Sequence, residues 1–195
     1  METLLNITDR IDGVITRIGR IASLLAIPLM LTILYDVIQR KFGGQGSIKL
    51  QELEWHFHAA LFLLCFGFAY IRDSHVRIEL IRDTLRPRTR AIMEMVGGIL
   101  CVLPFCGLVL YFGFDFVHRS FANHEVSSAA TGLTHRWIIK SMVPIGFGLL
   151  ACAGISIFLK CFVFVFGPER LRQRSGFYVG THHADLGQVI PKLKD

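Results

Sequence analysis

Four apolar segments, each about as long as a membrane-crossing helix, dominate the sequence. They run from 21 to 38, 55 to 71, 95 to 114 and 141 to 159, and Asp36 is their only Asp, Glu, Lys or Arg. A helix needs roughly 20 residues to cross a hydrocarbon core of about 30 Å. The segments are continuous and lack the two-residue alternation and regular turns of a membrane barrel. The sequence therefore predicts an all-α membrane protein with four transmembrane helices.

The composition argues against a water-soluble enzyme. Hydrophobic residues make up 52% of the chain and charged residues 18%, which is too little charge to cover a soluble globule of 195 residues. Lys and Arg (21) exceed Asp and Glu (15), but they lie between the apolar segments and form no single basic stripe. We therefore expect no nucleic-acid partner, a lipid bilayer as the surroundings, and no catalytic residues.

The expected organisation is one transmembrane domain over residues 1–166 and a cytoplasmic tail over 167–195. The spans are placed at about 21–41, 52–71, 91–117 and 138–164. Apolar residues recur every three or four positions from about 4 to 20, between charged residues. This pattern predicts an amphipathic helix lying along the cytoplasmic surface, with a simple extension of the first span as the alternative.

The connection after the second span is a second amphipathic segment. It contains His75, Arg77 and Glu79 among apolar residues that cover about half of a helix circumference. A segment lying on anionic lipid and a docking element for a partner subunit explain this pattern equally well. Both interpretations stay open from the sequence.

The distribution of Lys and Arg predicts the orientation. The N-terminal stretch, the connection after the second span and the tail hold fourteen of them, and the other two loops hold six. Loops rich in Lys and Arg stay in the cytoplasm. Both termini are therefore expected in the cytoplasm.

Cysteine and histidine raise two cofactor hypotheses. The five cysteines lie in or at the ends of apolar segments with no CxxC pair, which argues against a thiol oxidoreductase. The second hypothesis is a b-type cytochrome, with haem between histidines such as His56, His58 and His118. Because these histidines lie at the ends of the spans, we favour no cofactor and no metal and keep haem binding as the alternative.

Charged residues near the outer ends of the first two spans are candidates for contacts with a partner. Asp36 and Arg40 are four residues apart, a spacing that places them on one helix face. Glu52 and Glu54 open the second span, where negative charge suits the helix dipole, and Trp55 follows as an interfacial aromatic residue. No charge lies deep enough to predict an ion pathway through this chain alone.

Small residues predict close helix contacts in two places. Gly97-Gly98 lies in the third span, and Gly148, Cys152 and Ser156 form a series at four-residue spacing in the fourth. Small side chains let helix backbones approach one another in lipid. The contacts could be within this chain or with a partner.

Several segments together resemble one transporter family. They are the run 51–55 that opens the second span, the run 75–80 after it, the run 35–40 that closes the first span, and 137–147 at the start of the fourth. In order and spacing they resemble the small membrane subunit (DctQ type) of tripartite ATP-independent periplasmic (TRAP) transporters. The resemblance extends over nearly all of the chain.

The resemblance implies an accessory role in a bacterial inner membrane. In this family a periplasmic substrate-binding protein captures an organic acid or related solute, and a large membrane subunit moves it inward with sodium. The small subunit supports the large one. Candidate contacts with the large subunit are Asp36, Arg40, Glu52, Glu54, Trp55, His75, Arg77 and Glu79. The outer loop 118–136 is a weaker candidate for contact with the binding protein.

Overall fold

The computed structural model describes residues 1–44, 46–72, 87–129 and 131–175. Its helices are α1 (Glu2–Ser23), α2 (Ala26–Gly43), α3 (Ile48–Ile71), α5 (Pro87–Gly97), the π-helix η1 (Gly98–Val102), α6 (Leu103–Ala122), α7 (Trp137–Phe166) and α8 (Glu169–Arg174). Within the described residues, four helical stretches are long and apolar enough to cross a membrane: Glu2–Gly43, Ile48–Ile71, Pro87–Ala122 and Trp137–Phe166. The predicted all-α fold with four candidate transmembrane helices is confirmed.

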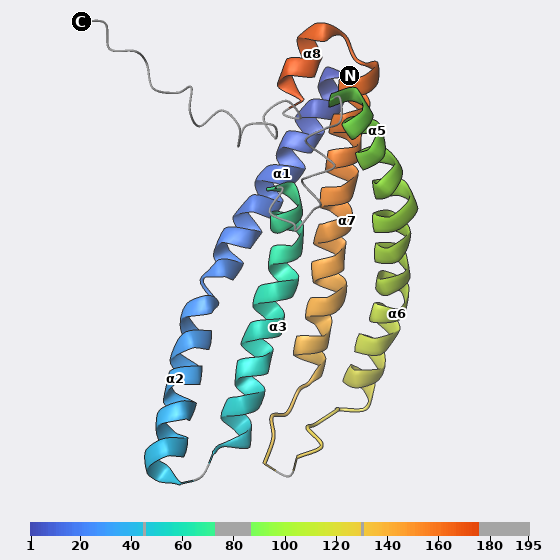
Figure 1. Cartoon of the computed structure of the whole chain (residues 1–195). Coiled ribbons are helices and arrows are strands. Elements are labelled where there is room, and N and C mark those ends of the chain that lie inside the picture. The colour runs from blue at the N-terminus through green and yellow to red at the C-terminus, as the bar shows by residue number, and fades with distance from the viewer. Residues whose placement is uncertain (45, 73–86, 130, 176–195) are drawn as a thin grey trace, which may run out of the picture.

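The four long stretches run side by side as an up-and-down bundle (Figure 1). Residues 44–47 connect α2 to α3, and residues 123–136 connect α6 to α7, both at the end that we call the loop end. The N-terminus, α5 and α8 lie at the opposite end, the terminal end. Helix α7 is central, since it contacts α1, α3, α5 and α6 and carries the most buried residues.

A bend separates α1 from α2 and has its cause in Pro28. Proline has no N–H, and its ring crowds the carbonyl four residues earlier, which here belongs to Leu24. The chain tightens at this point: the N–H groups of Leu24, Leu25 and Ile27 each bond to the carbonyl three residues before. Leu24 and Leu25 keep right-handed helical angles, so α2 continues in the general direction of α1.

The N-terminal amphipathic segment packs along the bundle. Its face made by Leu5, Thr8, Ile15, Gly19 and Ala22 is buried, and α1 contacts both α3 and α7. The helix is thus in line with α2 and covered by two neighbours, an arrangement closer to the extension of the first span than to a helix lying apart from the bundle. The amphipathic pattern arises because one face meets protein and most of the charged residues lie on the other.

The third long helix contains an irregular turn. The π-helix η1 ends two residues before Pro104, and the N–H of Leu103 bonds to the carbonyl of Gly98, five residues earlier. Proline has no N–H to donate, and the wide turn lets the helix continue past it. Pro144 lies inside α7, which continues to Phe166.

Burial is concentrated at the terminal end. One cluster joins Leu5, Val163 and Leu171, a second joins Ala91, Cys161, Phe164 and Val165, and a third joins Ile15, Tyr70 and Ala153. Helix α8 supplies Leu171, so the beginning of the predicted tail belongs to this packed end. Asp36 is the only buried residue in α2.

Glycines bring α3 and α7 into backbone contact. A Cβ added at Gly146 would lie 2.6 Å from the carbonyl oxygen of Leu63, and one at Gly67 would lie 2.9 Å from that of Leu149. Both distances are shorter than any normal carbon–oxygen contact, so only glycine allows this approach. At Gly148 the nearest atom would be 4.0 Å away, and at Gly97 and Gly98 no described atom would lie within 4 Å. The predicted contacts at Gly97-Gly98 therefore do not form within the described chain.

Candidate partner interface

Asp36 and Arg40 form the expected pair near the end of α2. The Arg40 Nε–H donates to Asp36 Oδ2 over 2.6 Å. Asp36 is buried, whereas 49% of the Arg40 side chain remains exposed. Pairing on one helix face lowers the cost of placing a carboxylate in an apolar span. The pair leaves a cationic group at the surface of the loop end.

Glu52 is directed into its own chain. It is buried, and its two carboxylate oxygens accept hydrogen bonds from separate donors in the 123–136 loop. The Ser127 hydroxyl donates to Oε1, and the Leu133 N–H donates to Oε2 over 2.6 Å. Hydrogen bonds to an ionised acceptor are among the stronger ones in proteins. Glu52 therefore ties the loop to α3.

The loop is shaped to receive this carboxylate. The Ala129 N–H donates to the Ser127 Oγ over 3.2 Å, and the Ser127 N–H donates to the Leu133 carbonyl over 3.1 Å. A Cβ added at Gly132 would lie 2.2 Å from Ser127 Cβ and 2.9 Å from Glu52 Oε1. No local sequence pattern indicates this contact, because Ser127, Gly132 and Leu133 lie 75 or more residues from Glu52.

Glu54 and Trp55 differ from Glu52 in their surroundings. The Oε1 atom of Glu54 is buried and has no hydrogen-bond donor among the described residues. Trp55 is 60% exposed, so most of its indole is available to lipid or to a partner. Of the candidate contact residues that the structure describes, Arg40 and Trp55 are the most accessible. His75, Arg77 and Glu79 lie outside the described residues.

A second tie holds the same loop to the start of α7. Lys140 forms an ion pair with Glu125, and its Nζ lies 4.0 Å from the centre of the Phe116 ring. Hydrogen bonding to Lys140 keeps the pKa of Glu125 below its ordinary value. Glu125 therefore stays ionised at neutral pH. The loop end thus carries an ordered surface, anchored on α3 at one point and on α7 at another.

Comparison with protein families gives a match to the DctQ component of the tripartite ATP-independent periplasmic transporters over residues 29–163. The chain belongs to the DctQ family. No curated protein matches the chain. Membership of the DctQ family makes the chain a component of a transporter and implies partnership with a large membrane subunit and a binding protein.

The DctQ match begins within α2, so α1 lies outside it. This helix is nevertheless fixed to the bundle by polar contacts with α7. The Ser156 hydroxyl donates to Asp12 Oδ1 over 2.6 Å, and Lys160 forms an ion pair with Asp12 Oδ2. Lys160 interrupts the last apolar stretch of the sequence, and its charge is compensated by a residue 148 positions away.

Within the described part of this DctQ protein, the histidines and cysteines form no recognisable metal centre. The described residues contain no group of three or more His, Cys, Asp or Glu side chains placed to hold a metal ion. The Nδ1–H of His56 donates to the backbone carbonyl of Glu52 over 2.6 Å. The His56 ring is therefore bonded to the backbone of its own helix, α3.

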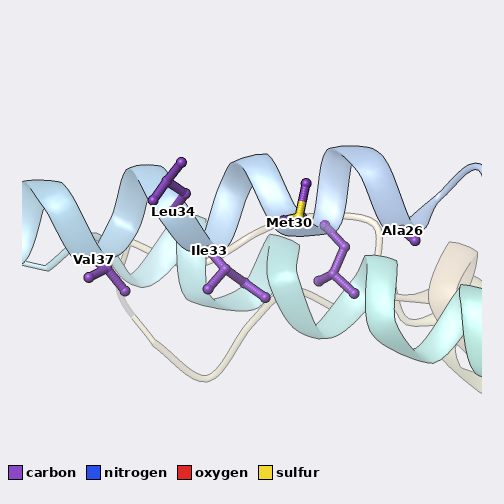
Figure 2. Close-up of a pocket in the computed structure, with 6 residues that line it drawn as sticks. Ala26, Met30, Ile33, Leu34 and Val37 are labelled. Carbon is purple, nitrogen blue, oxygen red and sulfur yellow. The ribbon is translucent and has the colours of Figure 1, made fainter.

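Two apolar grooves lie on the outside of the DctQ bundle. One, of about 360 Å³, runs along α2 and is lined by Ala26, Leu29, Met30, Ile33, Leu34 and Val37 (Figure 2). The other, of about 420 Å³, runs mainly along α6 and includes Leu108, Phe112, Phe116 and Val143. Exposed apolar surface on a span is covered by lipid or by another protein. Both faces are open to lipid or to a membrane partner.

Proposed function

We propose that this DctQ protein is the small accessory subunit of a TRAP transporter in a bacterial inner membrane. It supports the large membrane subunit during sodium-coupled uptake of an organic acid or related solute delivered by a periplasmic binding protein. The observation that carries the proposal is the family match from α2 to α7, which includes most of the bundle.

The internal polar contacts support an accessory role. Asp36 is paired with Arg40, Asp12 with Lys160, and Glu52 with the 123–136 loop. Groups that are occupied in this way stabilise the fold and are poor candidates for carrying an ion through the membrane. The exposed faces of α2 and α6 offer packing surface to a larger partner.

Co-purification tests the proposal directly. We expect the tagged protein, extracted from its native membrane in mild detergent, to bring down a much larger membrane protein in near-equal amount. In vesicles with a sodium gradient, uptake should require both membrane subunits and the binding protein. Purification of the protein alone, with a Soret absorption band, would contradict the proposal and favour the haem-binding alternative.

We also propose that both termini lie in the cytoplasm. The fourteen Lys and Arg residues on the terminal side, against six on the loop side, support this orientation. We expect a single cysteine introduced at Asn123 in a variant lacking native cysteines to react with an impermeant thiol reagent added to intact spheroplasts. A cysteine at Glu2 should react only after lysis, and the reverse pattern would overturn the orientation.

A further inference from the structure

Exposed arginines mark the two ends of the apolar surface on α1 and α2. Between Arg20 and Arg40 the only Asp, Glu, Lys or Arg is Asp36, which is buried. The two arginines are 20 residues apart, and α2 continues in the general direction of α1. This separation is about 30 Å at a rise of 1.5 Å per residue, which matches the thickness of a hydrocarbon core. Arg20 therefore lies at the terminal edge of the core and Arg40 at the loop edge.

The other arginines of α1 lie at two different depths beyond this edge. The headgroup layer extends about 5–8 Å beyond the hydrocarbon core on each side. Arg17 is exposed and lies one turn from Arg20, about 5 Å further out, so both arginines are in the headgroup layer. Arg10 is also exposed but lies about 15 Å beyond Arg20, which places it in the water outside this layer.

At the loop end, two exposed arginines have a counter-ion on their own helix. Arg40 bonds to Asp36 on α2, and Arg119 forms an ion pair with Asp115 on α6 over 2.7 Å. In both pairs the carboxylate lies four residues before the arginine, the spacing at which side chains meet on a helix surface. These arginines therefore add little net charge to the loop edge.

Arg17 and Arg20 have no such counter-ion. No Asp or Glu lies three or four residues from either of them, and neither forms an ion pair with a described residue. Asp12, the nearest acidic residue along α1, is bonded to α7. The two arginines are themselves neighbours on the helix surface, where like charges repel. The terminal edge therefore carries two adjacent positive charges that an anion from outside the chain would neutralise.

The apolar surface next to these charges fits a lipid. Ile21 is 63% exposed and Leu24 is 61% exposed, and both lie within about one turn of the arginines on the side of the hydrocarbon core. A phospholipid supplies acyl chains for this apolar surface and a phosphate for the guanidinium groups. A soluble anion would leave the apolar surface unmatched.

We propose that Arg17 and Arg20 bind the headgroup of an anionic phospholipid, whose acyl chains lie against Ile21 and Leu24. The inference goes beyond the proposed function, because it requires neither the large subunit nor transport. An anionic surface strengthens binding by roughly fivefold for each nearby arginine. Helix α1, which lies outside the DctQ match, is then held by the lipid headgroups as well as by α7.

Lipid competition in nanodiscs tests the inference. The full chain, with any subunit that stays bound, is placed in nanodiscs of equal parts phosphatidylglycerol and phosphatidylcholine, and native mass spectrometry counts the lipids that it retains. Both lipids contain phosphate, but only phosphatidylglycerol has a net negative charge. We expect phosphatidylglycerol to be retained over phosphatidylcholine by roughly fivefold or more. Equal retention of the two lipids would overturn the inference.

Three variants assign the preference to the two arginines. The double variant Arg17→Gln with Arg20→Gln should lose most of the preference, whereas Arg17→Lys with Arg20→Lys should keep most of it. Arg10→Gln is the matched control, because it removes the same charge from an exposed position of the same helix outside the headgroup layer. An unchanged preference in the double Gln variant contradicts the inference, and so does an equal loss with Arg10→Gln.

Two further measurements exclude other anions. Phosphatidylglycerol added in detergent should raise the melting temperature, whereas inorganic phosphate at the same concentration should not. An equal rise with inorganic phosphate would assign the site to a soluble anion and overturn the inference. A preference found in the separated chain but absent from its complex with the large subunit would mean that the partner covers the arginines, which also overturns it.

Discussion

Replacing Glu52 with Ala is expected to free the loop between α6 and α7 while the four-helix bundle persists. The substitution removes the acceptor for the Ser127 hydroxyl and the Leu133 N–H at once. Because both bonds are made to a carboxylate, their loss should raise local opening of residues 126–133 by roughly tenfold or more. Hydrogen–deuterium exchange of a peptide containing the Leu133 amide measures this change.

Glu54 provides the matched control for this prediction. It lies two residues away on the same helix and has no donor among the described residues. Glu54→Ala should therefore leave exchange in the loop unchanged. Should both variants show equal exchange in residues 126–133, Glu52 is not the anchor of the loop.

Substitutions at the two glutamates also distinguish two causes of lost transport. If the loop contacts the binding protein, Glu52→Ala should weaken binding-protein affinity and uptake while the two membrane subunits stay together. If Glu54 contacts the large subunit, Glu54→Lys should lower recovery of the complex. Normal uptake with Glu54→Lys would remove Glu54 from the candidate contacts.

Replacing Gly146 with Ala is expected to destabilise the bundle at its centre. The added methyl group would lie 2.6 Å from the backbone oxygen of Leu63, so α3 and α7 must separate. Backbone atoms cannot move aside as a flexible side chain can, and overpacking of this kind costs about 1–3 kcal/mol or more. We expect a clear fall in the melting temperature measured in detergent.

Gly148→Ala is the control for Gly146→Ala. It makes the same change two residues along α7, where the nearest atom is the end of the Leu110 side chain at 4.0 Å. We expect its melting temperature to stay close to that of the unsubstituted protein. Equal melting temperatures for the two variants would mean that α3 and α7 are not in backbone contact at Gly146.

The sequence predicted the features that depend on local pattern. The length of the apolar runs indicated four transmembrane helices, and the four-residue spacing of Asp36 and Arg40 indicated their ion pair. Both follow from helix geometry, which relates neighbouring positions without knowledge of the fold. The recurrence of apolar residues in 4–20 likewise indicated an amphipathic helix, although not the neighbours that cover it.

The features that depend on tertiary contacts were out of reach of the sequence. The sequence marked Glu52 as a candidate contact with a partner subunit, because Ser127 and Leu133, to which it bonds, are on a distant loop. Gly146 carries no local sign that it, and not Gly148, meets another backbone. No local pattern connects Lys160 with Asp12, because Asp12 lies near the other end of the chain.

The uneven burial along the bundle means that this chain folds in two solvents. The cluster of Leu5, Val163 and Leu171 lies at the terminal end, where the many charges of α1 favour contact with water. Apolar contacts there draw on the hydrophobic effect, which lipid tails do not supply between helices. Cooling and urea therefore act mainly on the terminal end, whereas α2, with its exposed apolar face, responds to the lipid or detergent around it.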